Sequence, residues 1–143
     1  MKMPAGLQRY HVTVEREGTT RAVAKTRQHT LVLNAEKGRG ETGFNAAETL
    51  MASLGACFMT NLNSLAAKMR LAIEDITLDI DGVRLDDPPG ISQLTYVLTL
   101  VSKEPIEKLN QLYDLSVKWG TVTNTLIRGV QISGTLHVEK PAE

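Results

Sequence analysis

The residue best suited to chemistry in this chain is Cys57, the single cysteine among 143 residues. A thiolate is a strong nucleophile that peroxides oxidise to a sulfenic acid. An ordinary thiol titrates near about 8.5, so reactivity at neutral pH requires a cation, a base or a helix N-terminus beside the sulfur. One cysteine allows neither an intrachain disulfide nor a cysteine-based zinc site.

The stretch from Thr42 to Ala67 must position this cysteine, and it contains one charged residue, Glu48, in a chain that is 22% charged. Asn45 is a suitable N-cap, and Glu48 stands three residues later, where a capping box places its carboxylate. Polar interruptions make the stretch a poor membrane span. We predict a helix of about five turns that is buried on most of its faces. The prediction rests on apolar residues spaced three and four positions apart: Leu50, Leu54, Phe58, Leu62, Leu65 and Met69.

Two interpretations of Cys57 stay open, a reactive thiol and a small buried hydrophobe. Cys57 lies about 18 Å along the axis from the N-cap, too far for the dipole of its own helix to act on it. Glu48 is either a capping carboxylate or a site residue. Nine residues at about 100° each place Glu48 and Cys57 on opposite faces. One site can use both only if the helix is broken or a partner chain supplies Glu48.

The rest of the chain predicts an α+β fold with a mostly antiparallel sheet, because strands come in runs instead of alternating strictly with helices. A Gly-rich loop over 35–44 leads into the long helix. Length indicates a single domain over 1–143. The expected order is β-β-β-α-β-β-α-α-β, with strands at 10–17, 21–25, 29–34, 73–85, 91–102 and 130–138, the long helix ending near 70, and two further helices at 105–119 and 121–128.

Composition narrows the function class. The formal net charge is zero and the pI is 6.8, so no basic excess points to nucleic acid. The N-terminus lacks the apolar run of a signal peptide, which makes the cytoplasm the expected location. His11, His29 and His137 lie in strand patterns without ligand spacing, and we expect no metal, no other cofactor and no membrane partner.

Two segments resemble the OsmC/Ohr family. NAAETLMASLGACF, from Asn45 to Phe58, is similar to the signature in which an Asn-Pro start leads to Leu-Gly-Ala-Cys or Ala-Ala-Cys. GTVTNTL, from Gly120 to Leu126, is similar to the second segment, Cys-Pro-Val-Ser-Asn-Thr-Leu. The likeness covers about residues 10–139. It implies an OsmC-like fold with a central buried helix, and an intertwined homodimer with the cysteine-bearing helices at its centre.

The resemblance also implies a chemistry. In the peroxidase members one cysteine attacks an organic hydroperoxide, a second cysteine resolves the sulfenic acid as a disulfide, and an external dithiol reduces it. An Arg and a Glu hold and activate the first thiolate. Carried to this chain, these roles fall on Cys57, on Arg21 within Thr-Arg-Ala-Val, and on Glu48, with Arg39 as the second candidate for the cation.

Three departures from the family pattern keep two functions open. Gly120 stands at the resolving cysteine, Ala46 replaces the Pro of the Asn-Pro start, and Ala47 stands where peroxidase members carry Glu. The first hypothesis is a single-cysteine peroxidase that reduces a small organic hydroperoxide through Cys57, and that an external thiol regenerates. The alternative is a non-catalytic dimer that binds a small apolar ligand or senses redox state through Cys57. A purely structural or interaction dimer is a third hypothesis.

Overall fold

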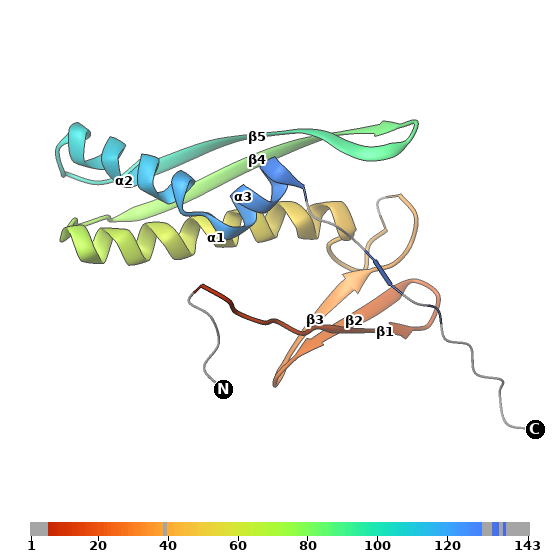
Figure 1. Ribbon diagram of the computed structural model, residues 1–143. Coiled ribbons are helices and arrows are strands. Elements are labelled where there is room, and N and C mark those ends of the chain that lie inside the picture. The colour runs from red at the N-terminus through yellow and green to blue at the C-terminus, as the bar shows by residue number, and fades with distance from the viewer. Residues whose placement is uncertain (1–5, 39, 130–132, 135, 137–143) are drawn as a thin grey trace, which may run out of the picture. The chain divides into compact units, whose positions relative to one another are not determined.

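The computed structural model describes residues 6–38, 40–129, 133, 134 and 136. Arg39 and His137 lie outside the described residues, as does most of the strand predicted over 130–138. The elements follow the predicted order up to α3 (Figure 1): β1 Thr13–Glu17, β2 Arg21–Thr26, β3 His29–Asn34, α1 Ala46–Met69, β4 Asp75–Asp86, β5 Pro89–Val101, α2 Ile106–Lys118 and α3 Thr121–Arg128.

The predicted α+β class is confirmed. β1, β2 and β3 form an antiparallel meander, and β4 pairs with β5 in a two-stranded sheet joined by a tight turn. At one end of the meander Arg21 lies opposite Glu17 on β1 and opposite Asn34 on β3. Residues directly opposite each other project from the same face of a sheet. Glu17, Arg21 and Asn34 therefore form one row across three strands.

Both ends of α1 are fixed by local hydrogen bonds. At its start, Glu48 N donates to Asn45 Oδ1 over 2.8 Å and Asn45 N donates to Glu48 Oε1 over 3.0 Å, which is the predicted capping box. At its end, Leu71 N donates to Ala66 O and Arg70 N to Ala67 O. These two bonds, with Arg70 at φ 58°, form a Schellman motif. The sequence close to each end therefore sets where α1 begins and stops.

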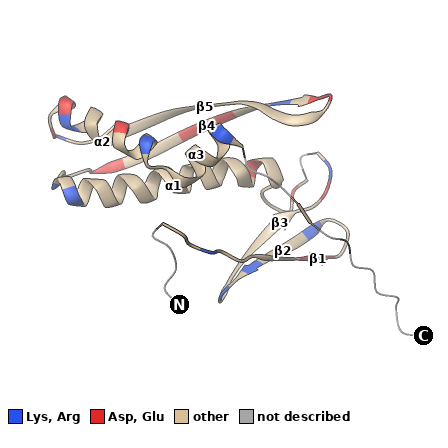
Figure 2. Ribbon diagram, in the orientation of Figure 1, with Lys and Arg blue, Asp and Glu red and all other residues tan. Residues whose placement is uncertain are grey.

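α1 buries one stripe of its surface in the single chain, which is less than we expected from its composition. The buried residues repeat at four-residue steps: Leu54, Phe58, Leu62 and Ala66. Figure 2 shows that charged residues are confined to the two ends of α1. Within the described ranges α1 is long and apolar enough to span a membrane, a test that core helices of soluble proteins also pass, and we draw no membrane assignment from it.

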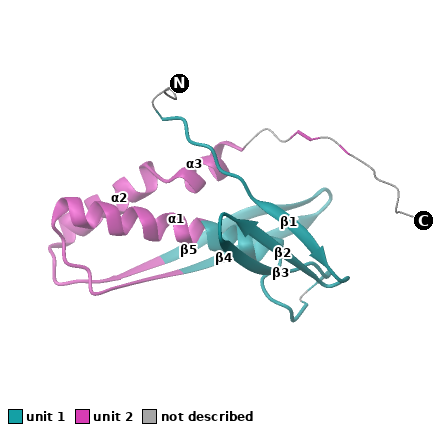
Figure 3. Ribbon diagram, turned by 90° about the horizontal axis from the view of Figure 1, so that it is seen from below, with its two compact units in different colours: residues 1–53, 79–97 teal, residues 54–78, 98–143 magenta. Residues whose placement is uncertain are grey.

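The chain divides into two compact units, which are described separately (Figure 3). The first unit holds residues 1–53 and 79–97, which include the meander and the first two turns of α1. In this unit α1 packs closely on β4, because a Cβ at Gly82 would lie 3.1 Å from Met51 Sδ. Asn34 N donates to Phe44 O over 2.9 Å, so the Gly-rich loop returns to the end of β3.

The second unit holds residues 54–78 and 98–143, and α2 packs on α1 within it. Asn61 Nδ2 on α1 donates to Ser116 O on α2 over 3.1 Å, beside the fully buried Leu62 and Leu112. The apolar spacing within 105–119 predicts Ile106 on the inward face of this helix, but its side chain is 63% exposed. The buried stripe of α2 runs through Leu112 and Ser116, where the small serine lets the two helices approach.

Replacing Leu62 by Ala tests this packing. Leu62 is 0% exposed, and its truncation should lower the free energy of unfolding by roughly 2–5 kcal/mol. Leu7→Ala is the matched control, because Leu7 is 45% exposed and its truncation should cost less than about 1 kcal/mol. Urea unfolding followed by circular dichroism measures both. Equal effects of the two substitutions would contradict the packing described for α1.

Candidate functional site

Cys57 lies beside the buried stripe of α1, not within it. Its neighbours Leu54 and Phe58 are 5% and 1% exposed, whereas Cys57 is half-buried. In the described part of the chain no hydrogen bond or ion pair reaches its sulfur. The helix thus places the thiol at the edge of the packed surface, where a small molecule or a second chain can reach it.

Glu48 is engaged in the capping box and is exposed at the start of α1. α1 is unbroken from Ala46 to Met69, so Glu48 and Cys57 lie on opposite faces of one regular helix. The helix is therefore not broken between Glu48 and Cys57. Both residues can serve one site only if a partner chain supplies Glu48. The catalytic role of Glu48 stays a prediction that requires a second copy of the chain.

Arg21 is the second residue of the meander row. Its Nη2 lies 3.3 Å from Glu17 Oε1, and among the described residues Glu48 is not one of its ion-pair partners. Arg21 Nε is buried and has no hydrogen-bond acceptor. The structure thus joins Arg21 to Glu17 and Asn34, two residues that sequence reasoning did not assign to a site. Pairing of the strands places these residues opposite Arg21, and this register could not be assigned from the sequence before the strands were paired.

Gly120, where the sequence resemblance predicts the position of a resolving cysteine, is buried at the start of α3. A Cβ at this position would lie 2.7 Å from Thr123 Oγ1, 3.0 Å from Thr123 Cβ and 3.3 Å from Ser116 O. Its φ of −78° is open to any residue, so lack of space and not backbone conformation favours glycine here. Packing in this chain therefore disfavours any side chain at position 120, including cysteine.

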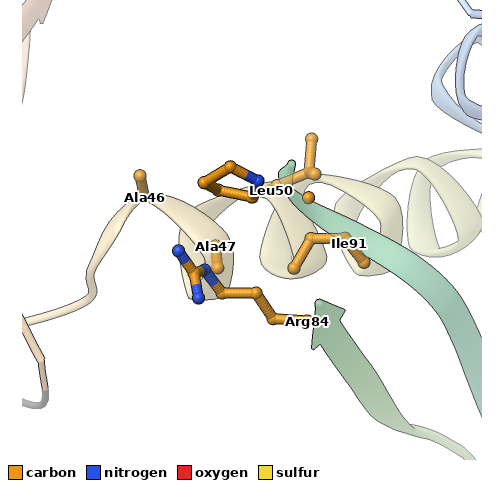
Figure 4. Close-up of a pocket in the computed structure, with 7 residues that line it drawn as sticks. Ala46, Ala47, Leu50, Arg84 and Ile91 are labelled. Atoms are coloured by element: carbon orange, nitrogen blue, oxygen red, sulfur yellow. The ribbon is translucent and has the colours of Figure 1, made fainter. Parts of the chain in front are cut away.

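A shallow apolar pocket opens at the first turn of α1, within the first unit (Figure 4). Its volume is about 290 Å³, near the lower end of the usual range for small-molecule sites. The Arg84 side chain extends toward the start of α1 and also contacts Asp86. The pocket is lined by Ala46, Ala47, Leu50, Arg84, Pro89, Gly90 and Ile91.

Sequence reasoning missed this pocket, although two of its lining residues carried a signal. Ala46 and Ala47 are the positions where the family pattern has Pro and Glu, and both are alanine here. Their methyl groups leave open space at the helix start that larger side chains would reduce. A pair of small replacements at adjacent positions was therefore a hint of a cavity.

The meander, the long helix with its lone cysteine, the β4–β5 hairpin and the two following helices define an OsmC-like α+β fold. A family model described as OsmC-like protein matches residues 38–134. The chain belongs to the OsmC-like protein family, as the two sequence motifs predicted. No curated protein sequence matches the chain well enough to count as a relative.

Solved structures share this fold. An OsmC-like protein from Mycoplasma pneumoniae aligns with a TM-score of 0.77 at 21% identity, over 86% of this chain and 89% of that one. The organic hydroperoxide resistance protein OhrB of Bacillus subtilis aligns with a TM-score of 0.59 at 20% identity, over 85% and 92%. An OsmC-like hydroperoxide resistance protein from Jannaschia sp. gives 0.57 at 17% identity, over 91% and 93%.

Two substitutions at Glu48 separate capping from catalysis. Glu48→Gln keeps a side-chain oxygen for Asn45 N, so stability should change by less than about 0.5 kcal/mol. Glu48→Ala removes the bond that Asn45 N donates to the Glu48 side chain, while Asn45 Oδ1 still caps residue 48 N, and should cost about 0.5–1 kcal/mol. If capping is the whole role, both variants keep the wild-type rate of thiol oxidation by cumene hydroperoxide. A slower reaction in Glu48→Gln at unchanged stability would instead assign Glu48 to the site.

Proposed function

We propose that the protein is a single-cysteine, thiol-dependent peroxidase that reduces small organic hydroperoxides through Cys57. The observation that carries the proposal is the place of Cys57 on α1, half-buried beside an apolar stripe within the segment that matches the OsmC-like family. Some structures with the same fold are named organic hydroperoxide resistance proteins, which supports the substrate class. Arg21 is our candidate for the cation that favours the thiolate.

The reaction would run in two stages. The Cys57 thiolate attacks the terminal oxygen of the hydroperoxide, an S–O bond forms, the O–O bond breaks, and the alkoxide leaves and takes up a proton. An external thiol then attacks the sulfenic sulfur and releases water, which gives a mixed disulfide. A second external thiol releases Cys57 and leaves as the oxidised disulfide. An external thiol is required because Gly120 provides no resolving sulfur.

The pocket at the start of α1 favours a second candidate function, binding of a small apolar ligand. Five of its lining residues are aliphatic or proline, and its floor includes Leu50, whose side chain is 38% exposed. An apolar ligand would cover this exposed surface, and burial of apolar area is the main driving force for such binding. This function needs no reaction at Cys57.

Thiol titration tests the peroxidase proposal. One equivalent of cumene hydroperoxide should remove one free thiol per chain, and a sulfenic-acid probe should label Cys57. Added dithiothreitol should restore the thiol and produce cumyl alcohol. Cys57→Ser is the control and should form no alcohol above the uncatalysed rate. An intact thiol after prolonged exposure at micromolar peroxide would contradict the proposal.

Filling the pocket tests ligand binding independently of the thiol. Calorimetry with cumyl alcohol on the Cys57→Ser protein should show binding that Ala47→Leu weakens about tenfold, about 1.4 kcal/mol. Ala52→Leu is the matched control, because Ala52 is exposed on the same helix and lies outside the pocket lining. Equal affinity in both variants, or no binding at all, would rule out this pocket as the ligand site.

A further inference from the structure

One buried hydroxyl group in the second unit has no hydrogen-bond partner among the described residues. It is Thr123 Oγ1, in the first turn of α3. Buried polar groups in native proteins almost always have a partner, because leaving one unpaired costs free energy. The hydroxyls of Thr60 and Thr125, by contrast, each donate to a carbonyl oxygen four residues earlier in the same helix. The Thr123 hydroxyl is therefore an exception that needs a physical explanation.

This hydroxyl lies at the corner between α2 and α3, against Gly120. A Cβ at position 120 would be 2.7 Å from Thr123 Oγ1 and 3.3 Å from Ser116 O. Ser116 is 1% exposed, and its carbonyl oxygen accepts the bond that Asn61 Nδ2 donates from α1 over 3.1 Å. The Thr123 hydroxyl is thus close to the point where α1 and α2 touch.

The register of the two helices brings Cys57 to the same corner. α1 and α2 run in opposite directions (Figure 1). Cys57 precedes Asn61 by one turn on the same face of α1, and Gly120 follows Ser116 by about one turn. One turn back along α1 and one turn forward along α2 from the Asn61–Ser116 contact end at the same level. The half-buried thiol therefore lies at the level of Gly120, next to the corner that holds the Thr123 hydroxyl.

We propose that the Thr123 hydroxyl donates a hydrogen bond to the oxygen of the Cys57 sulfenic acid. The inference rests on the proposed peroxidase function and adds to it a residue that sequence reasoning did not assign. In the reduced protein neither the sulfur nor this hydroxyl has a hydrogen-bond partner within the described part of the chain. Oxidation adds an oxygen to the sulfur, and that oxygen is the acceptor that the hydroxyl lacks.

Such a bond has a use in a chain that has glycine at position 120. The sulfenic acid must last until an external thiol arrives. In that interval a second hydroperoxide can transfer its terminal oxygen to the sulfur, which forms a sulfinic acid and releases an alcohol, and an external thiol does not reduce the sulfinic acid. A hydrogen bond to the sulfenic oxygen draws electron density away from the sulfur and makes it a weaker nucleophile. The Thr123 hydroxyl therefore prolongs the recoverable form of Cys57.

Thr123→Val tests the proposal, because valine keeps the shape of threonine without the hydroxyl. Mass spectrometry follows Cys57 at rising cumene hydroperoxide concentrations, before and after addition of dithiothreitol. The variant should form the sulfenic acid at the wild-type rate but the sulfinic acid about fivefold faster, the ratio expected for one neutral hydrogen bond. Thr123→Ser keeps the hydroxyl and should behave as the wild type. Thr125→Val is the matched control, because Thr125 is exposed and donates to Thr121 O.

The melting temperature of the reduced protein is the second readout. Thr123→Val removes a buried hydroxyl that has no partner, and valine and threonine have similar helix propensities, so the melting temperature should not fall. A lower value would show that the hydroxyl is already bonded within the chain and would overturn the proposal. Equal rates of sulfinic acid formation in Thr123→Val and the wild type would overturn it while the peroxidase function stands. An intact Cys57 thiol in the wild type would overturn both.

Discussion

The regularity of α1 is the constraint that fixes where Cys57 lies in this protein. The helix is fixed at its start by the Asn45–Glu48 capping box and at its end by the bonds that Arg70 and Leu71 donate. Between these points it runs for 24 residues without a break. A regular helix fixes the angle of every side chain about its axis. Once the buried stripe is chosen, the position of the Cys57 sulfur at its edge follows.

The regular helix and its packing assign structural roles to residues that the family resemblance had suggested for catalysis. The chain belongs to the OsmC-like family, and two of the positions that the resemblance singled out have structural roles in this chain. Glu48 holds the start of the helix on the face opposite Cys57. Gly120 is enclosed by Thr123 and Ser116, so a side chain at this position would require these neighbours to shift. Packing around position 120 thus favours glycine in this chain.

The meander presents a different kind of site, made by strand pairing and not by a motif. Its row of Glu17, Arg21 and Asn34 combines a solvated ion pair with two buried donors that lack acceptors. Backbone pairing places the three side chains together regardless of whether their hydrogen bonds are complete. Buried donors without an acceptor are exceptions in native proteins, so these two mark the end of the meander as unusual within the described residues.

Much of this molecule could be predicted from its sequence because the signals were local. Alternation gave the strands, the Asn45–Glu48 spacing gave the capping box, and Gly129 marked the end of α3 at φ 74°. The motif around Cys57 indicated the family, which the family model confirms over residues 38–134. Each of these features depends on residues close together in the sequence, so it can be predicted without knowing how distant segments pack.

The tertiary structure alone decided which faces are covered and which polar atoms are left without partners. Apolar composition could not tell that α1 buries only the Leu54–Ala66 stripe, or that the side chain of Trp119 is 64% exposed. Nor could it reveal the enclosure of Gly120 or the unpaired donors of Arg21 and Asn34. Burial and hydrogen bonding of this kind arise between segments distant in sequence, and their outcome depends on how those segments pack.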